Sequence, residues 1–145
     1  MIKDRDSWET PQKLWNELNK QYSFNIDCCA NELNSKTKRY FINFSDSGHI
    51  GINFICWMNP PFSKAYEMFK HFFKVVFKGV AIYRCDNIET KVWQEIIFKN
   101  ANWIFIFDKR INYEGQENKG ARFPSALIGF NVPVPKGLNG KLIHV

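Results

Sequence analysis

Residues 54–62 read Phe-Ile-Cys-Trp-Met-Asn-Pro-Pro-Phe, an apolar run that ends in a polar residue and two prolines. The apolar part predicts a buried strand over residues 54–58. Two consecutive prolines cannot continue a central strand, because proline lacks the backbone N–H that a sheet requires, so the chain leaves the sheet at Asn59. Open α/β sheets bind ligands at the carboxyl ends of such strands. The tetrapeptide Asn59-Pro60-Pro61-Phe62 is therefore the leading candidate for a functional loop.

Helix and strand patterns alternate on both sides of this loop. Thr10 and Pro11 are typical of a helix N-cap and first helical position, and the apolar residues at 14, 15 and 18 share one helical face. After the loop, apolar residues at 69, 72, 73 and 76 predict a second helix that ends at Gly79. A helix over residues 91–99 and a polar loop over 112–120 follow. Strands are predicted over residues 22–26, 80–83, 103–107, 126–130 and 142–145. This alternation predicts an α/β sheet covered by helices.

Length and composition restrict the class of protein further. The 145 residues suit a single domain, and 45% hydrophobic with 23% charged residues is ordinary globular usage. No apolar run approaches the ~20 residues that span a bilayer, and the polar N-terminus does not resemble a signal peptide, so we expect a cytoplasmic protein without membrane contacts. The four cysteines lack metal-site spacing and read as buried small apolar residues. The net charge of +6 is compatible with nucleic acid as a partner.

The residues of the proline loop suit the chemistry of an amino group on a nucleobase. Such a nitrogen is a poor nucleophile until acceptors engage its hydrogens, and the Asn59 side-chain oxygen supplies one acceptor. The Pro60 carbonyl supplies another, with its direction fixed by rigid proline dihedrals. Phe62 offers a flat face on which a flipped base can stack. The alternative is a turn that only terminates the strand, since Asn and Pro are common turn residues.

Five stretches in order along the chain carry a resemblance to a known family. They are residues 8–12 (WETPQ), residues 24–30 (FNIDCCA), Asp46 followed by residues 57–62 (WMNPPF), residues 108–113 (DKRINY) and residues 122–127 (RFPSAL). This set resembles the phage-type DNA N-6-adenine methyltransferases, a compact branch of the Dam-like, S-adenosylmethionine-dependent enzymes. The match covers nearly the whole chain. It departs from the family pattern at residues 83–87 (YRCDN), where a proline-bearing segment is usual, and at residue 109, where a glycine is usual.

The resemblance implies a fold, a reaction and a set of roles. It implies a compact Rossmann-like class I methyltransferase fold, with a mixed sheet flanked by helices, in one minimal domain (residues 1–145) without a large target-recognition insertion. The reaction is methyl transfer from S-adenosylmethionine to the exocyclic N-6 amino group of adenine in DNA, without a metal. The catalytic loop comprises Asn59, Pro60, Pro61 and Phe62. The cofactor contacts are Trp8, Thr10, Pro11, Asp27, Cys29, Ala30 and Asp46. Arg110, Lys119 and Arg122 flank the polar loop near the expected base-entry side and are, with Lys64, the candidate DNA contacts.

Several alternatives stay open at this stage. A catalytically inactive, methyltransferase-like basic module that binds nucleic acid or a protein partner fits the same sequence. Loops of this type also serve cytosine amino groups and glutamine amides, and the small size leaves a homodimer or a second subunit open for target recognition. Helix capping explains Thr10 and Pro11 as well as cofactor contact does, and turn chemistry explains Asp46. The lysines at 70, 74 and 78 fit a solvated helix face.

Overall fold

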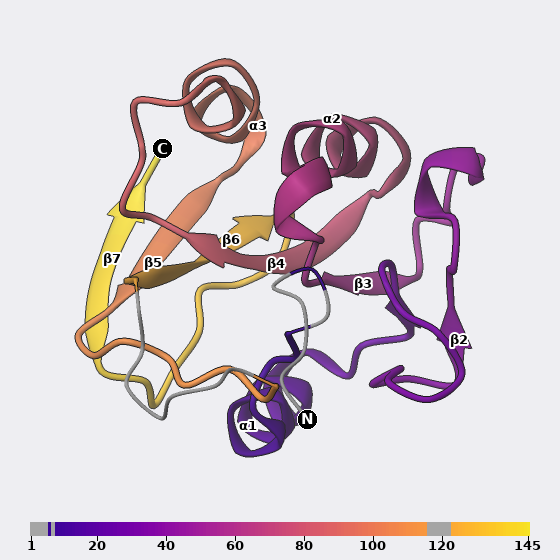
Figure 1. The fold of residues 1–145 in the computed structure, drawn as a ribbon, viewed down its shortest axis with the longest axis horizontal. Coiled ribbons are helices and arrows are strands. Elements are labelled where there is room, and N and C mark those ends of the chain that lie inside the picture. Colours follow the sequence, from indigo (N-terminus) through magenta and orange to yellow (C-terminus); the bar gives the residue numbers. More distant parts are fainter. Residues whose placement is uncertain (1–5, 7, 116–122) are drawn as a thin grey trace.

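The computed structural model describes residues 6, 8–115 and 123–145. Within them, seven strands form one mixed sheet in the order β2-β1-β3-β4-β6-β5-β7 (Figure 1). The strands are β1 (Ile26–Asp27), β2 (Arg39–Tyr40), β3 (Ile55–Met58), β4 (Lys78–Arg84), β5 (Trp103–Phe107), β6 (Ser125–Phe130) and β7 (Gly140–His144). Strands β2, β1, β3 and β4 are parallel, whereas β6 is antiparallel to both β4 and β5, and β7 is antiparallel to β5.

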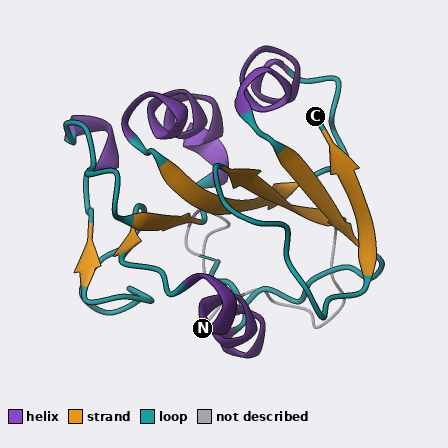
Figure 2. Cartoon of the chain, turned by 180° about the vertical axis from the view of Figure 1, so that it is seen from behind, coloured by secondary structure: helices purple, strands orange, loops and turns teal. Residues whose placement is uncertain are grey.

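Helices cover both faces of this sheet. Helix α1 (Gln12–Tyr22) packs on one face, and α2 (Ala65–Val75) lies on the other with the π-helix η4 (Val92–Ile97) and its continuation α3 (Phe98–Asn100) (Figures 1 and 2). Two short 3₁₀ turns, η2 (Phe44–Asp46) and η3 (Phe62–Lys64), complete the elements. The prediction of an α/β sheet flanked by helices is therefore confirmed. No helix in the described ranges is long and apolar enough to cross a membrane.

The order of the strands creates a crevice at one point of the sheet. From β1 the chain runs to β2 on one side, and then returns to the other side of β1 as β3. Because β1 and β3 are parallel, their carboxyl ends lie at the same edge, where the chain leaves in opposite directions. Asp27 ends β1 and Asn59 follows β3. The fold thus brings two polar side chains predicted for the site to one topological switch point.

The aromatic residues fill two apolar layers, one on each face of the sheet. On the α2 face, Phe69, Phe72 and Trp93 are fully or almost fully buried. On the α1 face, Leu18 and Trp57 are likewise fully or almost fully buried. The strand predicted over residues 103–107 is confirmed as β5, and its first three residues are buried. Burial of this many large side chains supplies the main free energy that holds the three layers together.

Three local predictions are wrong, each for an identifiable reason. The first helix begins at Gln12 with Pro11 as its N-cap, and Thr10 makes no capping hydrogen bond because its hydroxyl faces the loop after β3. The strand predicted from residue 22 begins at Ile26, because Tyr22 still belongs to α1 and Ser23 ends that helix with a left-handed φ of 52°. The second helix ends at Val75, so Gly79 does not terminate it and lies inside β4.

Gly129 in β6 marks a close approach inside the sheet. It pairs directly with Trp103 of β5, and a Cβ atom at residue 129 would overlap the Trp103 indole ring. The indole cannot turn away cheaply, because its N–H donates to the Val132 carbonyl at 2.9 Å and the side chain is buried. The absence of a side chain at residue 129 is therefore a packing requirement.

We expect Gly129→Ala to lower the free energy of unfolding by about 1–3 kcal/mol, through overpacking against Trp103. Urea denaturation followed by tryptophan fluorescence measures this. Gly48→Ala is the matched control, because nothing lies within 4 Å of a Cβ at residue 48. Equal stability of the two variants would contradict the packing argument.

Candidate active site

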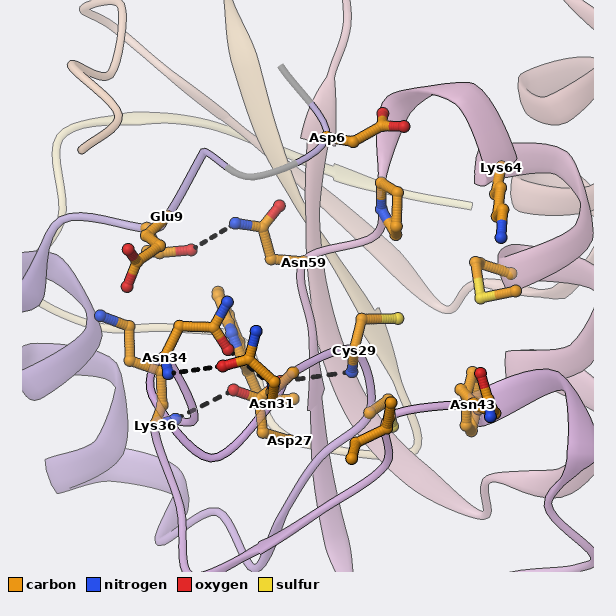
Figure 3. A pocket seen from close by; sticks show the side chains of 18 of the residues that line it. Asp6, Glu9, Asp27, Cys29, Asn31, Asn34, Lys36, Asn43, Asn59 and Lys64 are labelled. Atoms are coloured by element: carbon orange, nitrogen blue, oxygen red, sulfur yellow. Dashed lines mark hydrogen bonds between the residues drawn. The ribbon is translucent and has the colours of Figure 1, made fainter. Parts of the chain in front are cut away.

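A pocket of about 240 Å³ opens at the switch point, between the carboxyl ends of β1 and β3 (Figure 3). Its wall contains eight residues that sequence reasoning assigned to the site: Trp8, Thr10, Asp27, Cys29, Ala30, Asn59, Pro61 and Lys64. These residues come from the N-terminal segment, from the end of β1 and from the loop that follows β3. The fold therefore brings together most of the predicted set from three distant parts of the sequence.

Other predicted residues lie elsewhere. Pro11 caps α1, and Pro60 is buried beside the pocket without lining it. Asp46 is exposed in η2, although the three residues before it line the pocket. Arg110 is exposed and lies near Asp86, where it helps to lower the pKa of that carboxyl after the larger effect of the Arg84 hydrogen bond. Lys119 and Arg122 fall outside the described residues.

The Asn59 side chain is held by its amide nitrogen. That nitrogen donates to the Thr10 hydroxyl at 3.1 Å and to the Trp8 carbonyl at 3.3 Å. Within the described part of the chain, the Asn59 amide oxygen accepts no hydrogen bond, and it points away from Glu9 towards the side where Asp6 lies (Figure 3). The contact with the Trp8 carbonyl fixes which way the amide faces, because a carbonyl oxygen can only accept and the amide oxygen cannot replace the nitrogen opposite it. The site therefore presents one free, oriented acceptor.

The segment that holds Asn59 is itself anchored. Glu9 exchanges two backbone hydrogen bonds of 2.9 Å with Glu114, and the Glu114 carboxylate accepts from the Gln12 N–H at 2.8 Å. Trp8 stacks on Tyr113 and on Phe123 with ring centroids 6.4 and 6.2 Å apart. The N-terminal segment is thus pinned to the strand-like stretch near residue 114 and lies across the end of the sheet.

Phe62 does not line the pocket but packs beside it. Its ring meets Trp8 edge-on at 6.1 Å and Phe123 edge-on at 5.3 Å, and it lies 6.2 Å from the Tyr83 ring. The side chain is only half-buried. Phe62 therefore separates the pocket from a second aromatic surface at the end of β4.

Asp27 is a buried carboxylate at the base of the pocket, with 3% of its surface exposed. Its two oxygens accept backbone N–H groups, one from Lys36 at 3.0 Å and one from Cys29 at 3.4 Å (Figure 3). Burial raises the pKa of Asp27 from 3.8 to about 6, and the two N–H donors offset part of this effect. At neutral pH the carboxylate is charged, and it can accept hydroxyl or ammonium hydrogens from a ligand.

Sequence reasoning did not anticipate the loop that closes the pocket after Ala30. Asn31 and Asn34 line the pocket and bond each other, since the side-chain oxygen of each accepts a backbone N–H of the other, at 2.7 and 3.1 Å. Lys36 also lines it, and its ammonium donates to the Gln12 side chain at 2.9 Å. The spacing of the two asparagines was the available signal, because Asn side chains commonly bond backbone groups two or three residues away.

The fold and the pocket define an α/β protein with a ligand site at its switch point, built around an oriented asparagine and a buried carboxylate. The model of the DNA N-6-adenine-methyltransferase (Dam) family matches residues 1–126, and the chain belongs to that family. A similar curated protein is the DNA N-6-adenine-methyltransferase of Haemophilus phage HP1 (strain HP1c1). It is 27% identical over 146 residues, which cover 92% of this chain and 83% of the phage protein.

The raised pKa of Asp27 predicts a specific pH dependence. The folded protein binds the Asp27 proton more tightly than the unfolded chain does, so this residue makes the free energy of unfolding fall as the pH rises from about 4 to about 6. Asp27→Asn has no proton to lose. We expect the difference in the free energy of unfolding between wild type and Asp27→Asn to change by up to about 3 kcal/mol across this pH window. Urea denaturation at pH values from 4 to 7 measures this difference. If the free energies of unfolding of the two proteins change with pH in parallel, the raised pKa of Asp27 is contradicted.

Proposed function

We propose that this protein transfers a methyl group from S-adenosylmethionine to the N-6 amino group of adenine in DNA, on a Rossmann-like methyltransferase fold in a single minimal domain. The observation that carries the proposal is the orientation of Asn59, whose amide nitrogen is bonded to Thr10 and Trp8 while its oxygen accepts no hydrogen bond from the described residues beside the switch-point pocket. The Dam-family match supports adenine as the acceptor and S-adenosylmethionine as the cofactor. The expected location is the cytoplasm of a bacterial or phage-infected cell.

The pocket suits a ligand with a cationic, hydroxylated part and an aromatic part. Asp27 offers a buried carboxylate, which suits ammonium or ribose hydroxyl groups. Trp8 and Phe44 contribute apolar ring surface to the same wall. When bound, S-adenosylmethionine supplies a methyl group activated by its sulfonium. Asp27, Cys29 and Ala30 would hold it from the end of β1, and Trp8 and Thr10 from the N-terminal segment.

The chemical contribution of the protein is to position the acceptor nitrogen. The Asn59 oxygen is arranged to accept one hydrogen of the adenine amino group, and the Pro60 carbonyl is proposed to accept the other. Engaging both hydrogens aims the nitrogen lone pair towards the methyl group, and the surplus proton leaves to solvent after transfer. Because the Asn59 oxygen is oriented before substrate arrives, little reorganisation is needed in the transition state. Phe62 provides the adjacent ring face for the flipped base.

DNA is the proposed partner, and the charge of the chain agrees with this. Lys64 is exposed at the wall of the pocket and Arg110 is exposed near the end of β4, so both are in reach of a strand that delivers a base to Phe62. Phosphate contacts of this kind provide affinity without sequence choice. Contacts to a recognition sequence are proposed to come from few residues or from a second copy of the chain.

The competing function is a non-catalytic basic module that retains DNA but transfers nothing. It predicts DNA binding without cofactor binding and no effect of changes at Asn59. The oriented oxygen of Asn59 favours the enzyme, because a module that only binds has no need for an acceptor fixed by two partly buried hydrogen bonds.

Asn59→Ala is expected to lower the rate of methyl transfer at least ~10²-fold with the fold intact, because positioned polar groups contribute on this order. The assay incubates unmethylated DNA of varied sequence with isotope-labelled S-adenosylmethionine, digests the DNA to nucleosides and identifies the labelled base by mass spectrometry. Asn16→Ala is the control, since Asn16 is an exposed residue of α1. A labelled cytosine would show that cytosine, and not adenine, is the acceptor base. No label from folded wild type would favour the binding module.

Thr10→Val is expected to lower kcat by about tenfold, because it keeps the shape of the side chain but removes one acceptor that orients the Asn59 amide. Thr10→Ser restores the hydroxyl and should recover most of the activity. Single-turnover rates with saturating cofactor separate this effect from cofactor affinity. Equal rates for the Val and Ser variants would show that the hydroxyl does not orient Asn59.

A further inference from the structure

Arg84 stands at the carboxyl end of β4, next to the aromatic surface that Phe62 borders. Its guanidinium carbon lies 4.7 Å from the centroid of the Phe123 ring and 5.8 Å from that of the Phe62 ring. The side chain is 21% exposed, so part of it reaches solvent. A cation in contact with Phe62 therefore flanks the place where the base is proposed to stack.

The conformation of Arg84 is fixed from two directions. Its Nε and Nη2 donate to the two carboxylate oxygens of Asp86 at 2.7 and 2.6 Å, a bidentate arrangement. Its backbone carbonyl accepts from the Trp93 indole N–H at 3.1 Å, and Trp93 projects from the π-helix η4. The next residue, Cys85, donates its N–H to the Pro124 carbonyl at 2.9 Å. Short π-helical segments often occur at functional sites.

The pairing with Asp86 leaves part of the guanidinium for another ligand. Asp86 engages Nε and one edge of Nη2, whereas a guanidinium has five N–H donors in a planar fork. The opposite edge, formed by Nη1 and Nη2, matches the spacing of two phosphate oxygens. Arg110 lies close enough to Asp86 to help lower the pKa of its carboxyl, so the group of three side chains carries a net positive charge.

We propose that Arg84 contacts a backbone phosphate of the DNA strand that carries the target adenosine, and so positions that strand against Phe62. This inference rests on the proposed function, because it takes the ring of Phe62 as the stacking face. A guanidinium that lies over two rings and is held by a bidentate carboxylate is already ordered, so a phosphate contact costs little side-chain entropy. Arg84 is thus a positioning residue for the substrate, placed outside the cofactor pocket.

The test compares Arg84→Gln and Arg84→Lys with Arg39→Gln. Arg39 is a matched control because its guanidinium also lies over an aromatic ring, 5.1 Å from the centroid of Phe54, but on the edge strand β2. Binding of a short fluorescein-labelled DNA duplex of mixed sequence is followed by anisotropy at several salt concentrations, without cofactor. The KM for DNA and the affinity for S-adenosylmethionine are measured in parallel, with thermal unfolding as the check on the fold.

For Arg84→Gln we expect the slope of log K against log salt to become smaller by about 1, as for the loss of one phosphate contact. The KM for DNA should rise about tenfold, because one charged hydrogen-bond contact is lost. Cofactor affinity should stay unchanged. Arg84→Lys should keep the salt slope, since it keeps the charge, and Arg39→Gln should match wild type in every assay.

An unchanged salt slope in Arg84→Gln would overturn the inference while leaving the methyltransferase proposal intact. Parallel loss of thermal stability and cofactor affinity would show a structural role instead and would also overturn it. A smaller slope in a protein that transfers no methyl group would support the phosphate contact and reject the proposed reaction. Failure of the wild type to bind DNA would reject both.

Discussion

The two hydrogen bonds that the Asn59 amide nitrogen donates to Trp8 and Thr10 are the interaction on which the site depends. An amide has two chemically different ends, and a loop after a strand does not decide which end faces a ligand. Here the N-terminal segment supplies both acceptors, so the Asn59 nitrogen is hydrogen-bonded within the protein and the Asn59 oxygen faces the pocket. The bridge between Glu9 and Glu114 and the stacking of Trp8 then fix the segment itself. The loop after β3 and the segment from Trp8 to Thr10 therefore form one unit.

The switch point explains why this unit lies next to a buried carboxylate. Strand β1 has only two residues in the sheet, yet it is buried between β2 and β3, and its last residue is Asp27. Burial of a carboxylate is costly, and the loop of residues 28–36 offsets the cost by turning two backbone N–H groups towards it. The same turn brings Asn31 and Asn34 into the wall. The parallel register of β1 and β3 places all of this beside Asn59.

Much of the fold could be predicted from the sequence because its signals were local and consistent. The apolar run before Asn59, the helical spacing of the apolar residues in α2 and the apolar residues of β5 all favoured the same secondary structure that packing in the folded protein requires. Thr10 shows where such reasoning ends: its neighbour Pro11 made capping plausible, and only the three-dimensional contact with Asn59 gives its hydroxyl another use. Arg84 appeared only within a segment that departs from a family pattern, because the two rings it contacts, Phe62 and Phe123, are distant in sequence and meet it only at the ends of β4 and β6.

Phe62 links the two halves of the site. It packs against both apolar layers of the protein, through Trp8 towards the α1 face and through Tyr83 towards the α2 face. The loop that orients Asn59 therefore cannot shift without moving a ring that also touches the Arg84 guanidinium. A strand that bends Arg84 towards its phosphate would press on the same ring. The switch-point pocket and the aromatic surface at the end of β4 thus share one side chain, so the proposed cofactor site and the proposed DNA contact are coupled through Phe62.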